Sequence, residues 1–308
     1  MKPVAVVAAA LCVLLACWSL VHHTSDPRYR ITDTGLYEQY GDAVARGAVP
    51  YRDFALEYPP AAIPVFVLPS LGHERDRAAY DRWFDREMAL CACLALLGVA
   101  VALRGAIHAP PALLTVAVAP LLLGPVVLSR FDYWPAALAA LALAALVHRR
   151  LPLAAVLLGA AVGAKLWPAV LVPPAAVWLA RTRGPRAAGA FLGGVAAVVA
   201  AIFVPFAALA PAGLGHSFHE QLARPLQLES LVWRGGHPGL HLVRRRQDDR
   251  HRLRMDGADD VVCFGREKAE ERVLALNRIG LGAPECLFTG SIGPRRRRAA
   301  DPPRTQTR

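Results

Sequence analysis

The chain has 308 residues, of which 55% are hydrophobic and only 19% are charged, and its mean hydropathy is +0.34. Long apolar runs with so little charge are typical of a polytopic membrane protein and exclude an ordinary soluble domain. The net charge of +11 comes mainly from residues 234–308, which hold 17 basic and 10 acidic residues. No basic face interleaved with aromatic residues accompanies this charge, so we expect no nucleic-acid partner.

Six apolar runs are candidates for membrane helices, because a span needs about 20 apolar residues and at least about 17. They are Pro3–Val21, Met88–Leu103, Pro110–Ser129, Phe131–Val147, Leu151–Ala180 and Ala187–Ala210. The fifth run is too long for one span and is interrupted by Lys165 and by three prolines. It therefore predicts two short helices that meet near Lys165. The expected fold is all-α, with about seven membrane helices.

The charges between these runs predict the topology. Three alternate connections contain arginine and no acid: Arg104, Arg149, Arg150, Arg181, Arg183 and Arg186. Because cytoplasmic loops are enriched in basic residues, these connections are expected in the cytoplasm. Residues 22–87 then form a large extracytoplasmic first loop. Within it, residues 59–71 are too short to cross and predict an interfacial or re-entrant segment, while residues 73–88 predict a helix that lies on the membrane surface.

Polar residues gather in this first loop. Asp33, followed by Tyr37 one helical turn later, suits a general base acting on a hydroxyl group. The alternative for Asp33 is a helix N-cap or a solvated loop acid. The stretch YRDFALEYPP then adds five polar or aromatic side chains directly before an apolar run: Tyr51, Arg52, Asp53, Glu57 and Tyr58.

Three further ionisable residues lie at the ends of spans, where charge is costly and by default indicates function. They are Arg130, Asp132 and Lys165. The alternative for Lys165 is a cation that extends from a helix end to the lipid headgroups. The alternative for Arg130 and Asp132 is that they pair with each other.

Five short segments occur in an order that resembles one known family. They are DTGLY at Asp33–Tyr37, GAVPYRDFALEYPP at Gly47–Pro60, SRFDYWPA at Ser129–Ala136, GAAVGAKLWP at Gly159–Pro168 and RPLQLES at Arg224–Ser230. Together they resemble glycosyltransferase family 87, the polyprenol-phosphate-mannose-dependent mannosyltransferases with the GT-C membrane fold. The resemblance covers residues 1–232.

The resemblance implies transfer of a hexose, expected to be mannose, from a polyprenyl-phosphate sugar to a lipid or glycan acceptor, with inversion, on the extracytoplasmic face of the plasma membrane. It implies that Asp33 is the catalytic base and that cations stabilise the leaving phosphate, for which the candidates are Arg52, Arg130 and Lys165. It implies no cofactor and no metal. The candidates for substrate binding are Tyr37, Tyr51, Asp53, Glu57, Tyr58, Asp132, Arg224 and Glu229.

Residues 233–308 depart from the family pattern, which normally continues into further spans. Their 16 arginines predict either a disordered basic tail or, as we favour, a frameshifted or truncated end that could leave the chain inactive. Two other classes remain as alternatives: a transporter or flippase, for which the repeated halves are not seen, and a catalytically inactive membrane scaffold.

Overall fold

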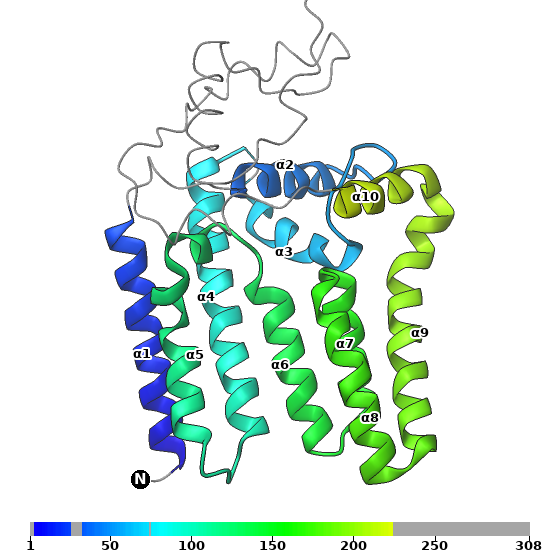
Figure 1. The fold of residues 1–308 in the computed structure, drawn as a ribbon. Helices are drawn as coiled ribbons and strands as arrows, with labels where there is room; N and C mark the ends of the chain where they lie inside the picture. The colour runs from blue at the N-terminus through cyan, green and yellow to red at the C-terminus, as the bar shows by residue number, and fades with distance from the viewer. Residues whose placement is uncertain (1–2, 26–32, 74, 224–308) are drawn as a thin grey trace, which may run out of the picture. The chain divides into compact units, whose positions relative to one another are not determined.

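The computed structural model describes residues 3–25, 33–73 and 75–223, which are almost entirely helical and include no β-strand (Figure 1). The helices are α1 (Pro3–Thr24), α2 (Thr34–Ala45), α3 (Ile63–Val67), α4 (Arg77–Ala102), α5 (Ala109–Leu123), α6 (Tyr133–Val147), α7 (Leu151–Ala164), α8 (Val172–Arg183), α9 (Pro185–Leu209) and α10 (Pro211–Ala223). The candidate site residues Arg224 and Glu229, and residues 233–308, lie outside the described part.

Most of the long helices stand side by side, and α2, α3 and α10 lie across one end of this bundle (Figure 1). Three helical segments of the described residues are long and apolar enough to cross a membrane: Val4–Thr24, Ala109–Leu128 and Pro185–Leu209. The helices α6 and α7 are apolar but shorter. These features confirm an all-helical membrane protein, whereas the number of about seven membrane helices stays a prediction.

The long apolar run from Leu151 is broken where the sequence predicted a break. Helix α7 ends at Ala164, and Lys165 has an extended backbone with φ −156° and ψ 146°. A 3₁₀ turn at Trp167–Leu171 leads into α8, whose first turn contains prolines. Proline fits the first turn of a helix because its missing N–H would have no intrahelical partner there. The break therefore presents Lys165 at a helix end.

The prediction of a separate surface helix over residues 73–88 is wrong. Residues Arg77–Ala102 form one continuous helix, α4, and the side chain of Asp76 caps it by accepting a hydrogen bond from the Ala79 N–H at 3.0 Å. The side chains of Tyr80, Phe84 and Met88, each four residues apart, are fully buried in the core. The aromatic periodicity reflects a buried stripe of a longer helix, while Asp81, Arg82 and Arg86 lie on its exposed side.

Helix α2 is fixed across the end of the bundle by close packing and by ion pairs. A Cβ atom at Gly41 would lie 2.0 Å from the carbonyl oxygen of Phe66, so only glycine lets α2 approach α3 this closely. Arg77 of α4 donates to the carboxylate of Glu38 at 3.1 Å and contacts the hydroxyl of Thr34. Because Thr34 opens α2, these contacts also fix the position of Asp33, the residue before it.

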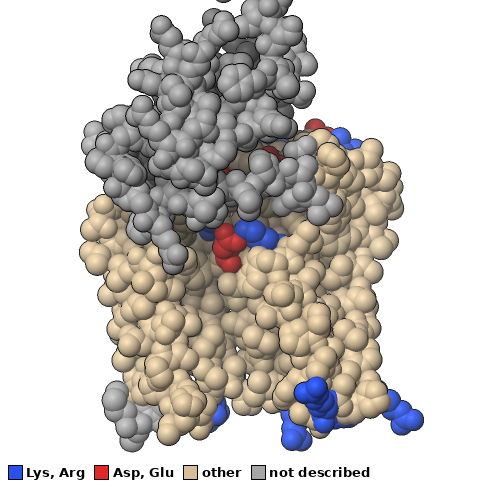
Figure 2. Space-filling view, viewed as in Figure 1, with Lys and Arg blue, Asp and Glu red and all other residues tan. Residues whose placement is uncertain are grey.

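The opposite end of the bundle carries the arginine-rich connections α4–α5, α6–α7 and α8–α9 (Figure 1). Figure 2 shows basic side chains at this end of the visible face, whereas acidic and basic side chains together occupy a hollow near the end that carries α2. The two ends of the described bundle thus differ in the kind of charge they present, which is the asymmetry that the sequence predicted.

Candidate functional site

An ion pair between Asp33 and Arg130 forms the centre of the candidate site. Asp33 lies directly before α2, and Arg130 lies in the connection between the 3₁₀ turn Gly124–Leu128 and α6. A guanidinium nitrogen of Arg130 contacts Oδ2 of Asp33. The two side chains are 16% and 25% exposed respectively, so the pair is largely shielded but still reachable from solvent.

The side chain of Asp33 does not cap its helix. Asp33 occupies the N-cap position of α2, but its carboxylate accepts no hydrogen bond from the first turn. Only its backbone oxygen does so, from the N–H groups of Leu36 and Tyr37. The capping alternative therefore does not explain why an aspartate is present, because the carboxylate points instead at Arg130 and, at 3.5 Å, at the hydroxyl of Tyr37.

A second ion pair lies beside the first. The ammonium group of Lys165, at the end of α7, contacts Oδ1 of Asp132. It also lies 5.0 Å from the centre of the Phe131 ring, within the range of a cation–π interaction. The proposed pairing of Arg130 with Asp132 is wrong, because each of these residues pairs with a different partner. The two ion pairs thus share the short segment Arg130–Asp132, with Phe131 between the two paired residues.

Buried aromatic rings form the floor beneath these charges. The ring of Tyr37 is stacked on Phe66 with 4.5 Å between the centres, and the ring of Phe131 meets the Tyr58 ring edge-on at 5.0 Å. The hydroxyl groups of Tyr37 and Tyr58 lie 3.5 Å apart. Burial, and then the neighbouring Tyr58, raises the pKa of Tyr37 well above its ordinary value. The Tyr37 hydroxyl therefore keeps its proton and serves as a hydrogen-bond donor toward Asp33.

The turn at residues 51–54 carries a further ion pair, between Arg52 and Asp53. Tyr51 adopts φ 67°, an unusual value for a bulky residue, and its hydroxyl donates to the carbonyl of Tyr58 at 2.6 Å. Arg52 and Asp53 bind each other at 2.8 Å in an exposed ion pair. The hydrogen bonds from Arg52 and then from the Val49 N–H lower the pKa of Asp53 to about 2. The guanidinium of Arg52 is thus bound by Asp53. A role of Arg52 at the donor phosphate stays a prediction.

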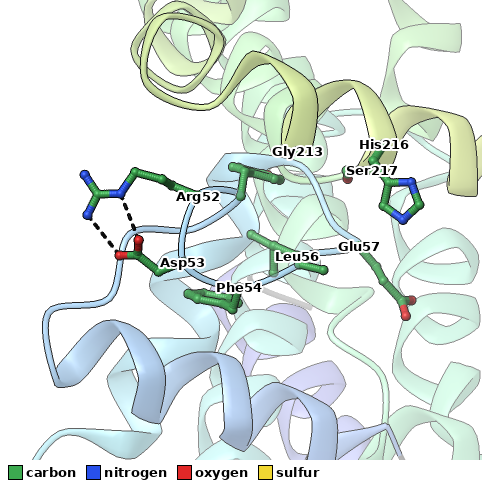
Figure 3. A pocket seen from close by; sticks show the side chains of 10 residues that line it. Arg52, Asp53, Phe54, Leu56, Glu57, Gly213, His216 and Ser217 are labelled. Carbon is green, nitrogen blue, oxygen red and sulfur yellow. Dashed lines mark hydrogen bonds and ion pairs between the residues drawn. The ribbon is translucent and has the colours of Figure 1, made fainter. Parts of the chain in front are cut away.

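A pocket of about 280 Å³ lies between this turn and α10 (Figure 3). The turn supplies Phe54, Leu56 and Glu57, and α10 supplies His216 and Ser217. Helix α10 approaches through Gly213, where a Cβ atom would lie 2.0 Å from the carbonyl oxygen of Tyr51.

The sequence analysis did not single out the α10 residues or Arg77. No sequence motif marks either of them as functional. Arg77 is one of several charged residues in the first half of α4, and the described part of α10 has no charged motif. Only the placement of α10 against the turn at Tyr51 reveals His216 and Ser217 as neighbours of Glu57. Within the described residues, no three histidine, cysteine, aspartate or glutamate side chains gather as a metal site would require.

Comparison with known proteins identifies the family. Residues 56–233 match the profile of glycosyltransferase family 87. The matched range includes Arg130, Asp132 and Lys165 but begins after Asp33 and Tyr37. Neither the curated proteins nor the solved structures contain a match. Since the match covers more than half of the 308 residues and agrees with the apolar helical bundle, the chain belongs to glycosyltransferase family 87 and is a membrane glycosyltransferase.

Proposed function

We propose that this protein transfers a hexose, mannose in the first instance, from a polyprenyl phosphate to a hydroxyl group of a lipid or glycan acceptor. The observation that carries the proposal is the contact of Arg130 with Asp33 at the end of the bundle that bears α2. A carboxylate that could accept a proton and a cation that could bind a phosphate thereby share one partly shielded site.

In the proposed reaction, the acceptor oxygen attacks the anomeric carbon of the donor sugar. The bond from that carbon to the phosphate oxygen breaks, and the polyprenyl phosphate leaves with the bonding electrons. Asp33 takes the proton of the acceptor hydroxyl. Because attack and departure occur on opposite faces of the anomeric carbon, a β-linked donor gives an α-linked product.

Arg130 and Lys165 are the proposed groups that stabilise the phosphate. A phosphate oxygen would compete with the carboxylates of Asp33 and Asp132 for these two cations. Arginine suits such an exchange because its planar fork binds carboxylate and phosphate with the same geometry. Binding of the donor would then turn Arg130 from Asp33 toward the phosphate and leave the carboxylate to accept a proton.

The proposed sidedness follows from the two ends of the bundle. The connections rich in arginine lie at one end and the Asp33 site at the other (Figure 1). If the arginine-rich end faces the cytoplasm, the site opens on the extracytoplasmic face of the cell membrane. There it would meet a donor whose isoprenoid chain lies in the outer leaflet.

The test is sugar transfer by membranes that contain this chain, supplied with radiolabelled polyprenyl-phosphate mannose and total lipid acceptor. We expect the parent to transfer label and Asp33→Asn to lose at least about 100-fold, the lower range for a general base. The matched control is Asp76→Asn, which removes an exposed negative charge at the same end of the bundle and leaves a side-chain oxygen that can still cap α4. Full activity of Asp33→Asn would contradict the assignment of the base, and absence of label transfer by the parent would contradict the proposed donor.

A further inference from the structure

An exposed tryptophan on α4 holds an arginine and a histidine against its ring. The guanidinium carbon of Arg86 lies 5.0 Å from the centre of the Trp83 ring, within the range of a cation–π interaction. The ring of His73 lies nearly parallel to the indole, with 6.0 Å between the two centres. Trp83 nevertheless remains 46% exposed. These three side chains, called the Trp83 cluster below, therefore leave part of the indole open to a ligand.

The acidic residues of α4 near this cluster do not neutralise it. Asp81 pairs with Arg77 at 3.0 Å. Asp85 accepts a hydrogen bond from a tryptophan of α1 at 3.1 Å, and one carboxylate oxygen of Glu87 is buried. Among the described residues, no acidic side chain pairs with Arg86. The cluster therefore keeps a positive charge that an anionic ligand can balance.

Apolar residues adjoin the cluster on the side of the bundle. Leu90 follows Arg86 by one helical turn and is 59% exposed. The segment Met88–Ala102 of α4 contains no charged residue, and Leu71, in the connection before α4, is exposed as well. Tryptophan and arginine at such a border between charged and apolar segments are typical of the membrane interface. The Trp83 cluster thus has the position of a group that meets lipid headgroups.

A phosphate group suits the donors of this cluster. The planar fork of Arg86 can bind two phosphate oxygens. The indole N–H of Trp83 and a ring N–H of His73 can donate to a further phosphate oxygen or to an ester carbonyl. A zwitterionic headgroup also contains a phosphate, but its own cation would be repelled by Arg86. The charges therefore favour a lipid whose headgroup is a net anion.

We propose that the Trp83 cluster binds one anionic phospholipid, with the phosphate on Arg86 and the acyl chains along Leu71 and Leu90. The lipid belongs to the leaflet at the end of the bundle that carries α2, where α4 begins (Figure 1). It is neither the sugar donor nor the acceptor, so the inference does not depend on the proposed reaction. A lipid bound here would hold the first turns of α4 at the membrane surface.

Native mass spectrometry of the full chain tests this binding. The protein, purified in a non-ionic detergent, is titrated with phosphatidylglycerol or with phosphatidylcholine, and the fraction that carries one lipid is measured. We expect phosphatidylglycerol to bind at least about fivefold more tightly, and Arg86→Gln to lose about the same factor, the effect of one arginine near an anionic membrane surface. Trp83→Leu, which keeps an apolar side chain without the indole, should also weaken binding.

The matched control is Arg82→Gln. Arg82 is exposed on the same helix, one turn before Arg86, but within the described residues it lies against no aromatic ring. Its replacement should leave the affinity for phosphatidylglycerol within about twofold of the parent, whereas Arg86→Lys should keep part of the affinity because it retains the charge. Since these positions are exposed, all four variants should unfold at the same temperature as the parent when no lipid is added.

Four outcomes would overturn the inference. One is unchanged affinity in Arg86→Gln, and another is an equal loss in Arg82→Gln, which would indicate a diffuse positive surface without a built site. Equal binding of phosphatidylcholine by the parent would remove the preference for an anion. Finally, polyprenyl phosphate that displaces phosphatidylglycerol at a tenfold lower concentration would assign the cluster to the sugar donor instead.

Discussion

The guanidinium of Arg130 contacts the carboxylate of Asp33 across 97 positions of the sequence. The contact joins the first loop to the segment that precedes α6, and it turns the Asp33 side chain away from the cap of its own helix. In the proposed reaction Asp33 is the base and Arg130 binds the phosphate of the donor. Asp33 would therefore accept a proton only after the donor phosphate has drawn Arg130 away from it. The predictions below test this coupling and the fold that supports it.

Replacing Arg130 should impair use of the donor. Arg130→Gln removes the charge and is expected to lower kcat/KM for the donor by about 100- to 1,000-fold, the range for losing one group that stabilises developing charge. Arg130→Lys should recover part of this loss, because it keeps the charge but not the planar fork. Initial rates at varied donor concentration measure both.

The control for Arg130→Gln is Arg82→Gln, an exposed arginine on α4 at the same end of the bundle. If Asp33 and Arg130 act as a unit, the double variant Asp33→Asn, Arg130→Gln should lose no more than Asp33→Asn alone. Losses that simply multiply would show that the contact has no part in the reaction.

Replacing Lys165 tests whether its charge takes part in the reaction or only extends to the lipid headgroups. Lys165→Met keeps most of the length of the side chain but removes the charge that meets Asp132. We expect it to lower kcat/KM for the donor by about 10- to 100-fold at unchanged membrane abundance. Asp132→Asn should have a smaller effect, because Lys165 keeps its charge. Reduced abundance of Lys165→Met with normal kinetics would favour the anchoring role instead.

The close approach of α2 to α3 should make Gly41 intolerant of any side chain. Gly41→Ala would force a methyl group to within 2.0 Å of the Phe66 carbonyl oxygen, so the helices must separate. We expect a destabilisation of about 1–3 kcal/mol, as for other overpacked sites. Thermal unfolding of the purified protein in detergent measures it. Gly189→Ala, where a Cβ atom has nothing within 4 Å, is the control and should unfold like the parent.

Labelling of single cysteines tests which end of the bundle faces the outside of the cell. In a chain whose native cysteines are replaced, Ala106→Cys lies in the connection between α4 and α5, and Ala78→Cys lies near the start of α4 at the other end. Intact cells treated with a membrane-impermeant maleimide should label Ala78→Cys alone. Labelling of Ala106→Cys alone would invert the proposed topology and move the site to the cytoplasmic face.

Hydropathy and charge predicted much of the fold because both act locally. The apolar runs located the long helices, and a lysine with three prolines located the break between α7 and α8. The continuity of α4 from Arg77 through Met88 to Ala102 could not be read in this way. A buried aromatic stripe within a charged segment has the same periodicity whether the helix lies on a membrane or stands upright beneath another helix.

The candidate site was predictable as a set of residues and less so as a set of contacts. Asp33, Arg130 and Lys165 were recognised by residue type and position, but sequence proximity suggested that Arg130 pairs with Asp132. The folded chain instead crosses the pairs, because α6 and α7 lie beside each other and bring Lys165 to Asp132. His216 and Ser217 became visible only through the packing of α10 on a distant turn.

Several helices of the bundle are short, and this has a consequence for the membrane itself. Helices α6, α7 and α8 contain 15, 14 and 12 residues, which at 1.5 Å per residue span about 18–23 Å. The hydrocarbon of a typical bilayer is about 30 Å thick, so lipid would have to thin, or water to enter, around each of these helices that crosses it. We expect the phosphate of the donor to sink toward Arg130 and Lys165 while its isoprenoid tail stays in oil. Bilayer thickness would then set the reaction rate, and lipids with longer acyl chains should slow it.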